Sequence, residues 1–391
     1  MKIKHISPLP STVFNQLGWE YYISEQALGY LANELVQISK KEAEKLYEAT
    51  NEIYDLFVEA GEYVLQNNLL DTLGIPKNLH VLVRHTWERE NHLHLFGRFD
   101  WAGGIHEPLK LLEFNADTPT TLPETAILQW LQLKANKLDE NKQFNTVYDD
   151  LVNQFIRLKQ ANPSKEPRIL FSTLSGYPED DNNVALLMEA AAEAGFFTDF
   201  CFVEDVTFSE FDGIFAPNQY GDLAHFGFWF KLIPWEFIAE DEPELCEILS
   251  RLVTQEKLVI VNPAYSMLFQ SKGILPILAQ LFPENPYLLP TYFEIPKEQT
   301  ARNWVEKVVL GREGANVRFI DASGRTTDEN LGDYAHQKTI FQEKTNLERD
   351  DAGYYYQAGV FFAYQASGLS FRRAKQAIMD NSAQFIGHYW E

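Results

Sequence analysis

The sequence is poor in cysteine and in basic residues. Its two cysteines, Cys201 and Cys246, are too few for a disulfide framework or for a zinc site with four thiolate ligands, so we expect two reduced thiols. Lys and Arg total 33 against 56 Asp and Glu, which gives a formal net charge of −23. Nucleic-acid phosphates and anionic membrane surfaces repel such a polyanion, and both are therefore excluded as expected partners.

Segments that direct or anchor a protein are also missing. The start of the chain, MKIKHISPLPSTVFNQ, lacks the apolar core that a signal peptide carries after its basic residues. No window approaches the ~18 uninterrupted apolar residues of a membrane-spanning helix. The sequence therefore predicts a soluble, cytoplasmic protein whose partner is neutral or cationic.

The common nucleotide, zinc and hydrolase motifs are absent as well. There is no G-x-x-x-x-G-K-[ST] loop, no G-x-G-x-x-G after a strand, and no H-E-x-x-H, C-x-x-C or G-x-S-x-G. These absences disfavour P-loop enzymes, Rossmann dehydrogenases, zincins and α/β-hydrolases. His92 and His94 lie two apart and are a candidate metal pair, but no third His or Cys lies at ligand spacing. Ordinary polar positions are the simpler interpretation.

Apolar and aromatic residues, in contrast, are abundant, at 45% and 14% of the composition. Both values are too high for a disordered chain, and 391 residues suffice for two or three packing units. We expect an α+β protein in three parts: a helical front end followed by a hairpin over 1–150, a small α/β unit over 151–255, and a third part over 256–391. No repeat of about 20–50 residues is present, which disfavours a repeat architecture.

The spacing of apolar residues predicts where the helices and strands lie along the chain. Helical spacing from Ser24 to about Asn67 predicts a helical front end, in which Ser39 and Glu42 form a capping box that starts the second helix. A further helix is expected to follow Thr121. The remaining predicted segments are strands at 81–87, 94–101, 109–115, 168–172, 197–203, 213–216, 258–261, 303–310, 316–320 and 354–364, and helices at 184–194 and 273–281.

Two of these strands flank the turn-like residues 102–104 and carry polar side chains at alternate positions. Arg98 and Asp100 project from one face of the first strand, and Glu113 and Asn115 from one face of the second. If Arg98 opposes Asn115 in a hairpin, Asp100 opposes Glu113. Two facing carboxylates repel each other and require a cation, and oxygen ligands of this kind suit Mg²⁺. The alternative is a cross-strand ion pair between Arg98 and Glu113 on a solvated face.

Isolated basic residues form a second candidate group. Lys307 lies inside the apolar run 304–310, and a lysine among apolar neighbours must find an anion or reach water. Phosphate is one candidate partner, and an edge strand that carries a protective lysine is the alternative. Arg312 follows between two glycines, which allow close approach to a ligand. Lys272, at the start of the predicted helix 273–281, is placed to hold a phosphate beside a helix N-terminus.

Several segments resemble the glutathionylspermidine synthase family. The run LLEFNADTPT at 111–120 is similar to the family signature LLEYNADTPT, and residues 121–130 resemble the helix that follows it. Further matches occur in the same order along the chain: RFD at 98–100, PWE at 234–236, SKGILP at 271–276, the stretch from 282 to 290, GREGANV at 311–317 and GLSFR at 368–372. Ordered matches from about residue 18 to the C-terminus are far more specific than any single motif.

This resemblance implies an ATP-grasp fold preceded by a pre-ATP-grasp α/β domain, with residues 256–391 as the nucleotide-binding lobes packed with the hairpin. It also implies a carbon–nitrogen ligase that uses ATP and Mg²⁺. Such an enzyme activates a peptide-like carboxylate, such as glutathione, as an acyl-phosphate and joins it to an amine, such as the polyamine spermidine.

The matching motifs imply roles for individual residues. Arg98 corresponds to the arginine over the acyl-phosphate, and the Mg²⁺ ligands correspond to Asp100, Glu113 and Asn115. The implied nucleotide-binding residues are Lys272, Lys307, Arg312 and Gln342, and the implied substrate-binding residues are Thr118, Thr120, Glu179, Asp180 and Arg372.

The sequence also departs from the family pattern. The family's amidase domain, with its catalytic Cys and His, has no counterpart, so we expect a ligase-only protein. Lys307 is followed by Val308 where proline is usual, Arg372 by Arg373 where an acidic residue is usual, and the stretch 342–368 is short. These changes affect what can be inferred about the identity of the amine substrate and the affinity for ATP. The alternative function is a non-catalytic Mg-ATP-binding relative, whereas a sugar-processing protein, suggested by the abundant carboxylates and aromatics, is disfavoured.

Overall fold

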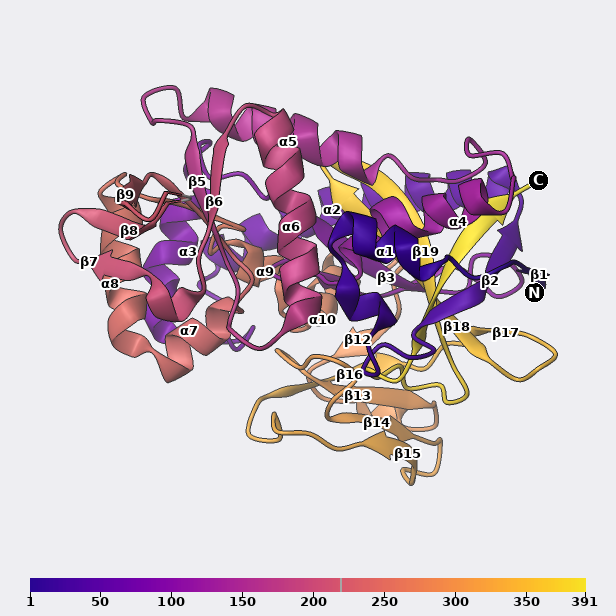
Figure 1. The fold of residues 1–391 in the computed structure, drawn as a ribbon. Coiled ribbons are helices and arrows are strands. Elements are labelled where there is room, and N and C mark those ends of the chain that lie inside the picture. Colours follow the sequence, from indigo (N-terminus) through magenta and orange to yellow (C-terminus); the bar gives the residue numbers. More distant parts are fainter. Residues whose placement is uncertain (219) are drawn as a thin grey trace.

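Four β-sheets organise the computed structural model, which describes residues 1–218 and 220–391 (Figure 1). The largest has eight strands and joins the two ends of the chain. Its order is β1 (Lys2–His5), β2 (Leu31–Ile38), β20 (Gln384–Trp390), β19 (Gln365–Ala374), β18 (Tyr355–Ala363), β3 (Gly97–Ala102) and β4 (Lys110–Asn115), and β17 (Glu348–Arg349) pairs with β18.

The second sheet is parallel, and its order is β11 (Val259–Val261), β10 (Phe228–Lys231), β5 (Arg168–Ser172) and β6 (Phe197–Phe200). Alternate side chains of β5 enter two different cores. Ile169 and Phe171 pack with α5 (Val147–Ala161) and α6 (Pro178–Glu193), whereas Leu170 packs into the core that includes α8 (Pro243–Thr254). Helices therefore cover both faces, as parallel sheets require.

The third sheet is antiparallel and is drawn in orange below the others in Figure 1. Its order is β12 (Thr291–Tyr292), β16 (Thr339–Glu343), β13 (Trp304–Val308), β14 (Val317–Ile320) and β15 (Thr326–Asn330). A small fourth sheet contains β7 (Thr207–Ser209), β8 (Gly213–Pro217) and β9 (Leu223–Phe226). The strand that carries Lys307, β13, is paired on both sides, so the edge-strand alternative is wrong.

The capping box predicted at Ser39 is confirmed at the start of α2 (Lys40–Gln66). Ser39 Oγ accepts a hydrogen bond from the Glu42 N–H at 3.2 Å, and Glu42 Oε2 accepts one from the Ser39 N–H at 2.6 Å. The helix predicted upstream is wrong over 24–38, because residues 24–30 form bends and turns and residues 31–38 form β2 between β1 and β20. Both partner strands lie at the chain ends, and such distant pairing leaves no signal in local apolar spacing.

Two other predicted elements differ from the structure. The segment 81–87 belongs to a helix, α3 (His80–Trp87), because a short apolar run does not distinguish a strand from a buried helix. The helix after Thr121 begins with one turn of π-helix, η3 (Glu124–Leu128), before α4 (Gln129–Ala135). The other helical elements are α1 (Ser11–Leu17), η1 (Glu20–Ile23), η2 (Lys77–Leu79), η4 (Val203–Asp205), α7 (Trp235–Asp241), α9 (Ser266–Gln270), α10 (Ile274–Leu281) and η5 (Lys297–Gln299).

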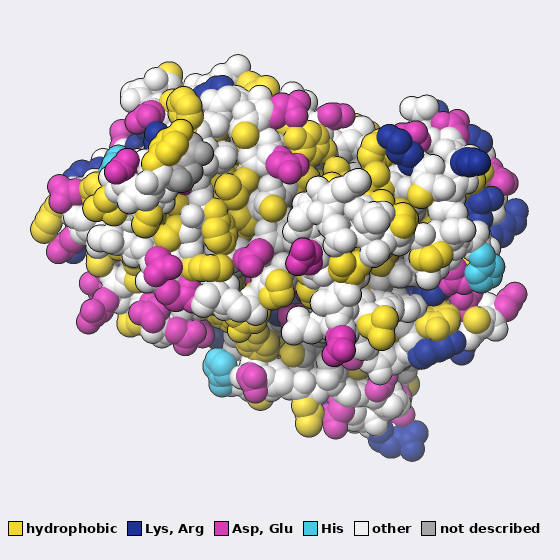
Figure 2. All heavy atoms as spheres, in the orientation of Figure 1, with side chains coloured by type: hydrophobic (Ala, Val, Ile, Leu, Met, Phe, Trp, Pro, Cys, Tyr) yellow, Lys and Arg dark blue, Asp and Glu magenta, His cyan; other side chains and the backbone are white. Residues whose placement is uncertain are grey.

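The surface agrees with the acidic composition. Figure 2 shows Asp and Glu side chains spread over one face of the molecule and gathered over α7 and α8, where Lys and Arg are sparse. Among the described residues, no helix is long and apolar enough to cross a membrane.

Candidate active site

A cavity of about 1250 Å³ lies between the β3–β4 hairpin, the five-stranded sheet and the N-terminus of α6. Every residue to which the family resemblance assigned a nucleotide, metal or substrate role lines this cavity. These residues come from the hairpin and the loop after it, from α6, from the segment before α10, and from β13, β16 and β19. The fold thus brings together side chains that are up to 274 positions apart, from Arg98 to Arg372.

The hairpin has the predicted register. Arg98 opposes Asn115 and Asp100 opposes Glu113, with a register shift only after Asp100. Its turn depends on Gly103, which has a φ of 72° and whose added Cβ would lie 2.1 Å from the Pro108 carbonyl oxygen. The register therefore places both carboxylates at the cavity wall.

Arg98 and Asp100 form a buried, bidentate ion pair. Arg98 Nε lies 2.7 Å from Asp100 Oδ1 and Nη2 lies 3.0 Å from Oδ2. Arg98 Nη1 also donates to the Thr120 carbonyl oxygen at 2.7 Å and to Thr121 Oγ1 at 3.2 Å. Because Arg98 is 7% exposed and its partner is Asp100, the predicted alternative of a solvated Arg98–Glu113 pair is wrong.

Glu113 instead faces two lysines. Its Oε2 lies 3.3 Å from Lys272 Nζ, and Lys272 also donates to the Gly311 carbonyl oxygen at 2.7 Å. Burial raises the pKa of Glu113, but the positive charges of Lys272, Lys307 and Arg98 outweigh burial and hold that pKa below its usual value. Glu113 is therefore ionised in the folded protein.

Lys307 is buried at the centre of its sheet. It donates to Gln342 Oε1 at 2.8 Å and to the Leu112 carbonyl oxygen at 3.2 Å. Burial lowers the pKa of Lys307 to about 8, against the attraction of Glu113. An incoming polyphosphate would favour the charged form of this lysine.

The oxygen atoms of the hairpin fit a hard divalent cation. Asn115 Nδ2 donates to Asp100 Oδ2 at 3.1 Å, which directs the amide nitrogen to the carboxylate and leaves the amide oxygen for a ligand. The described residues contain no group of three or more His, Cys, Asp or Glu side chains able to hold a metal. The hairpin set instead has two carboxylates and one amide, which suits Mg²⁺ that retains waters and binds substrate phosphates.

The other candidate metal pair, His92 and His94, does not line the cavity. Both side chains are buried, and burial lowers the pKa of each to about 4, so both rings are neutral at pH 7. One ring nitrogen of His94 is hydrogen-bonded to the Ala116 carbonyl oxygen at 2.8 Å. That contact supports the loop after β4.

The part of the cavity wall formed by the N-terminus of α6 is acidic. Glu179 and Asp180 lie in the first turn of α6, and Glu179 Oε2 accepts a hydrogen bond from the Tyr21 hydroxyl at 3.1 Å. Burial, together with the negative charge of Glu179, raises the pKa of Asp180 to about 7. This end can accept a cation, which would relieve the repulsion between the two carboxylates.

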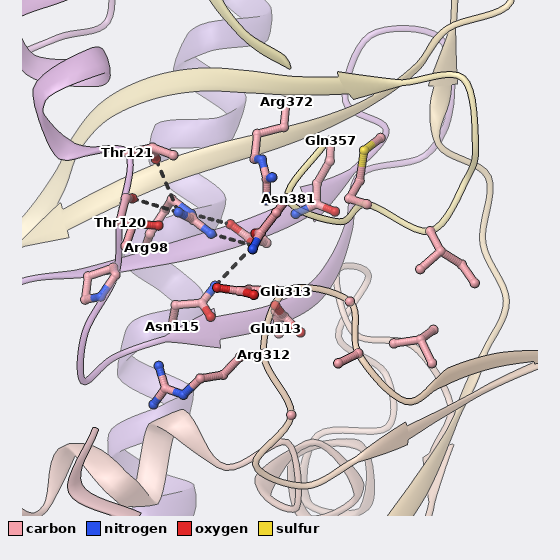
Figure 3. Close-up of a pocket in the computed structure, with 18 of the residues that line it drawn as sticks. Arg98, Glu113, Asn115, Thr120, Thr121, Arg312, Glu313, Gln357, Arg372 and Asn381 are labelled. Atoms are coloured by element: carbon pink, nitrogen blue, oxygen red, sulfur yellow. Dashed lines mark hydrogen bonds and ion pairs between the residues drawn. The ribbon is translucent and has the colours of Figure 1, made fainter. Parts of the chain in front are cut away.

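Arg372 lies close to the Arg98 side of the cavity (Figure 3). It occupies the position on β19 opposite Gln357 of β18, and its Nη2 donates to the Asp380 carbonyl oxygen at 2.5 Å. Its buried Nε has no partner among the described residues. An anionic substrate group would satisfy this donor.

Sequence reasoning missed several residues of the cavity. Gln357, Asn381 and Glu313 line it, as the close-up in Figure 3 shows, and Tyr30 does so beside α6. Glu236, which binds Arg312, was missed as well. Glu236 and Glu313 lie inside segments that match the family motifs, so the sequence could have indicated them as candidate site residues. Gln357 and Asn381 lie in segments without a motif, and their positions depend on strand pairing.

The chain matches other proteins over nearly its full length. It is 28% identical to a putative acid–amine ligase of Haemophilus influenzae over 96% of this chain and 95% of that protein. It is 24% identical to trypanothione synthetase of Crithidia fasciculata (85% of this chain) and 28% identical to the bifunctional glutathionylspermidine synthetase/amidase of Escherichia coli (81%). The chain spans 53% of each of these two longer relatives.

Comparison with solved structures supports the fold. A glutathione synthetase-like effector of Globodera pallida superposes with a TM-score of 0.58 at 10% identity and covers 98% of both chains. The two chains share a mixed α/β fold. The sequence profile of the glutathionylspermidine synthase preATP-grasp family matches residues 1–391, and the chain therefore belongs to this family.

Proposed function

We propose that the chain is an ATP- and Mg²⁺-dependent carbon–nitrogen ligase. It activates a peptide-like carboxylate, glutathione or a similar compound, as an acyl-phosphate and joins it to an amine, spermidine or a similar compound. Family membership and the activities named for the relatives support this proposal. The observation that carries it is the opposition of Asp100 and Glu113 in the hairpin, with Lys272 at 3.3 Å from Glu113.

We further propose that the fold is an ATP-grasp, with residues 256–391 as the nucleotide-binding lobes. The hairpin at the end of 1–150 packs with them, and residues 151–255 supply α6 with its acidic first turn and three of the four strands of the parallel sheet. The five-stranded sheet supports this assignment because Lys307 and Gln342 lie on its adjacent strands β13 and β16 and contact each other across the cavity wall.

In this proposal, Lys272 and Lys307 bind the phosphates of ATP, Gln342 lies on the side of the base, and Arg312 lies at the terminal phosphate. Asp100, Glu113 and Asn115 would hold Mg²⁺, which would supply positive charge to the phosphate oxygens. The two lysines suit the phosphates and the two carboxylates suit the metal of a metal–polyphosphate complex, and all four side chains line one cavity.

The remaining residues would bind the two other substrates. Thr118, Thr120 and Arg372 are placed to hold the peptide-like carboxylate, because a threonine hydroxyl and an arginine fork both suit a carboxylate. Glu179 and Asp180 are placed to bind an ammonium group of the amine. These partners are small molecules, and we propose no nucleic-acid or membrane partner and a cytoplasmic location.

The reaction has two steps. A carboxylate oxygen attacks the terminal phosphorus of ATP, the bond to the bridging oxygen breaks, and ADP leaves. The neutral amine nitrogen then attacks the acyl carbon, phosphate leaves with the electron pair of the broken C–O bond, and the attacking nitrogen loses one proton to give the amide. Arg98, fixed by Asp100 and Thr120, is placed to stabilise negative charge on the acyl-phosphate.

The test is an ADP-release screen of the purified protein against a matrix of peptides and polyamines, with mass spectrometry of the products. ADP release is expected only when a carboxylate and an amine are both present. Glu113→Gln should reduce turnover by about 10²–10³. The control is Glu59→Gln, on the exposed face of α2. Saturable ATP binding without turnover across the matrix would refute the ligase.

A further inference from the structure

A buried ion pair, Asp117 with Lys231, lies behind the cavity. Both side chains are 0% exposed, and Lys231 Nζ lies 3.2 Å from Asp117 Oδ1. Lys231 also donates to the Ile233 carbonyl oxygen at 2.7 Å, and its Nζ lies 4.3 Å from the centroid of the Trp235 ring. Neither charged residue lines the cavity, so neither touches a substrate there.

Two short paths lead from this pair to Arg312. Along the chain, the residue after Asp117 is Thr118, whose Oγ1 accepts a hydrogen bond from Arg312 Nη1 at 2.8 Å. Through space, Asp117 Oδ2 accepts a hydrogen bond from the Trp235 backbone N–H at 2.9 Å, at the start of α7. The residue after Trp235 is Glu236, whose Oε1 accepts from Arg312 Nε at 3.0 Å and Nη2 at 2.7 Å.

The two paths close into a ring of contacts. All three guanidinium nitrogens of Arg312 are engaged by Thr118 and Glu236, and Asp117 holds the backbone next to each of these acceptors. The Arg312 side chain is 18% exposed and lines the cavity. The position of this guanidinium is thus set by a charge that lies outside the cavity.

A purely stabilising role does not account for the pair. Replacing a buried ion pair with apolar residues is often neutral or stabilising, because two charges lose their hydration on burial. Burial indeed lowers the pKa of Lys231 despite the adjacent carboxylate. An apolar residue at position 117 could not accept the hydrogen bond from the Trp235 N–H at the start of α7. Without that hydrogen bond, the neighbouring Glu236 would lose its support.

We propose that Asp117 and Lys231 are positioning residues that fix Arg312 at the phosphate end of the cavity. Asp117 orients both acceptors of Arg312, and Lys231 holds the Asp117 side chain in place. The catalytic consequence of this role rests on the proposed ligase function, whereas the orientation of Arg312 does not.

The first experiment measures the orientation without turnover. Phenylglyoxal modifies arginine side chains, and mass spectrometry gives the rate at each one. We expect Arg312 to react severalfold faster in Asp117→Asn/Lys231→Met. Arg318 of β14, which pairs with Glu306 of β13 and does not line the cavity, should react at the wild-type rate. The double variant buries no unpaired charge. Asp117→Asn/Lys231→Gln, which likewise buries no unpaired charge, is the second variant if the first double variant does not fold.

The control is Asp199→Asn, which removes a buried carboxylate of β6 that pairs with Arg168 at 3.3 Å. It should leave Arg312 reactivity unchanged. An Arg312 rate equal to that of the wild type in folded Asp117 and Lys231 variants would overturn the proposal, and so would an equal increase in Asp199→Asn.

The second experiment is a double-variant cycle on ADP release. Asp117→Asn/Lys231→Met should lower kcat/KM by about 10–100-fold, since small misplacements near the reacting groups cost on this scale. Added to Arg312→Ala, the same changes should have almost no further effect, because the residue through which they act is gone. The same fold loss in both backgrounds would overturn the proposal. A wild-type protein without ADP release would refute the ligase function and leave the phenylglyoxal result to decide the orientation.

Discussion

Asp100 and Glu113 face each other across β3 and β4, yet each carboxylate is matched by a different cation. Asp100 accepts from Arg98 at 2.7 Å, and Glu113 lies 3.3 Å from Lys272. The repulsion expected of directly opposed carboxylates is therefore offset within the protein itself. Both carboxylates thus have a cationic partner before any ligand binds, and their oxygen atoms are of the kind that a hard divalent cation prefers.

The first prediction concerns the metal. Asp100→Asn should raise the Mg²⁺ concentration for half-maximal ADP release by at least about tenfold, because one charged oxygen ligand is lost. The measurement is a Mg²⁺ titration at saturating ATP. Glu107→Gln, in the turn of the same hairpin, is the matched control and should behave as the wild type. An unchanged Mg²⁺ dependence in Asp100→Asn would remove Asp100 from the metal site.

The second prediction concerns the cap of the long helix α2. Ser39→Ala should reduce the free energy of unfolding by about 1 kcal/mol, because the N–H of Glu42 loses its side-chain acceptor. Urea unfolding measures this loss. Ser39→Thr keeps the hydroxyl and should lose much less, and ADP release by either variant should match the wild type because Ser39 does not line the cavity. Equal losses in the two variants would show that the cap hydrogen bond is not responsible.

The hairpin could be predicted from the sequence because it is local. A period of two, a Gly-Gly turn and four polar side chains at fixed offsets are enough to give the register that places Asp100 opposite Glu113. The grouping of Lys272 and Arg372 in the same cavity is not local. This grouping was predicted from the ordered family motifs and not from residue spacing. The residues around Lys272 give no indication that Arg372 lies nearby, and the reverse is also true.

Two features that depend on distant partners were not predicted. Residues 31–38 form a strand whose long partner is β20 from the C-terminus, and the buried Asp117 is paired with Lys231 from the parallel sheet. In each case the determining contact joins segments more than a hundred positions apart. Local apolar spacing has no information about such contacts.

The third prediction concerns ATP. Lys307→Met should weaken ATP binding by about 1.5–3 kcal/mol, because a charge-assisted hydrogen bond to phosphate is lost. This weakening appears as a rise in the KM for ATP of roughly 10–100-fold. Lys338→Met is the control, since that lysine is exposed at the flank of β16 and donates to the Asp71 carbonyl oxygen. If Lys307→Met and Lys338→Met have the same KM for ATP, Lys307 does not bind the nucleotide.

The last prediction concerns pH and the amine. Burial and Glu179 raise the pKa of Asp180 to about 7, whereas an unfolded Asp titrates near ~3.9. The folded state therefore binds more protons between these values, so the stabilising contribution of Asp180 is full below about pH 4 and is lost as the pH rises through about 7. Without ligands, Asp180→Asn should then raise Tm relative to the wild type more at pH 8 than at pH 5.

A cationic amine should favour the ionised form of Asp180, because it pairs with the carboxylate. Spermidine binding to the wild type should tighten from pH 6 to pH 8 and release protons at pH 6, which calorimetry in two buffers of different ionisation enthalpy measures directly. Asp180→Asn should flatten this pH dependence. Asp149→Asn, an exposed Asp in the first turn of α5, should retain it. Proton release of the same size in Asp180→Asn as in the wild type would assign the titration to another group and remove Asp180 from the amine site.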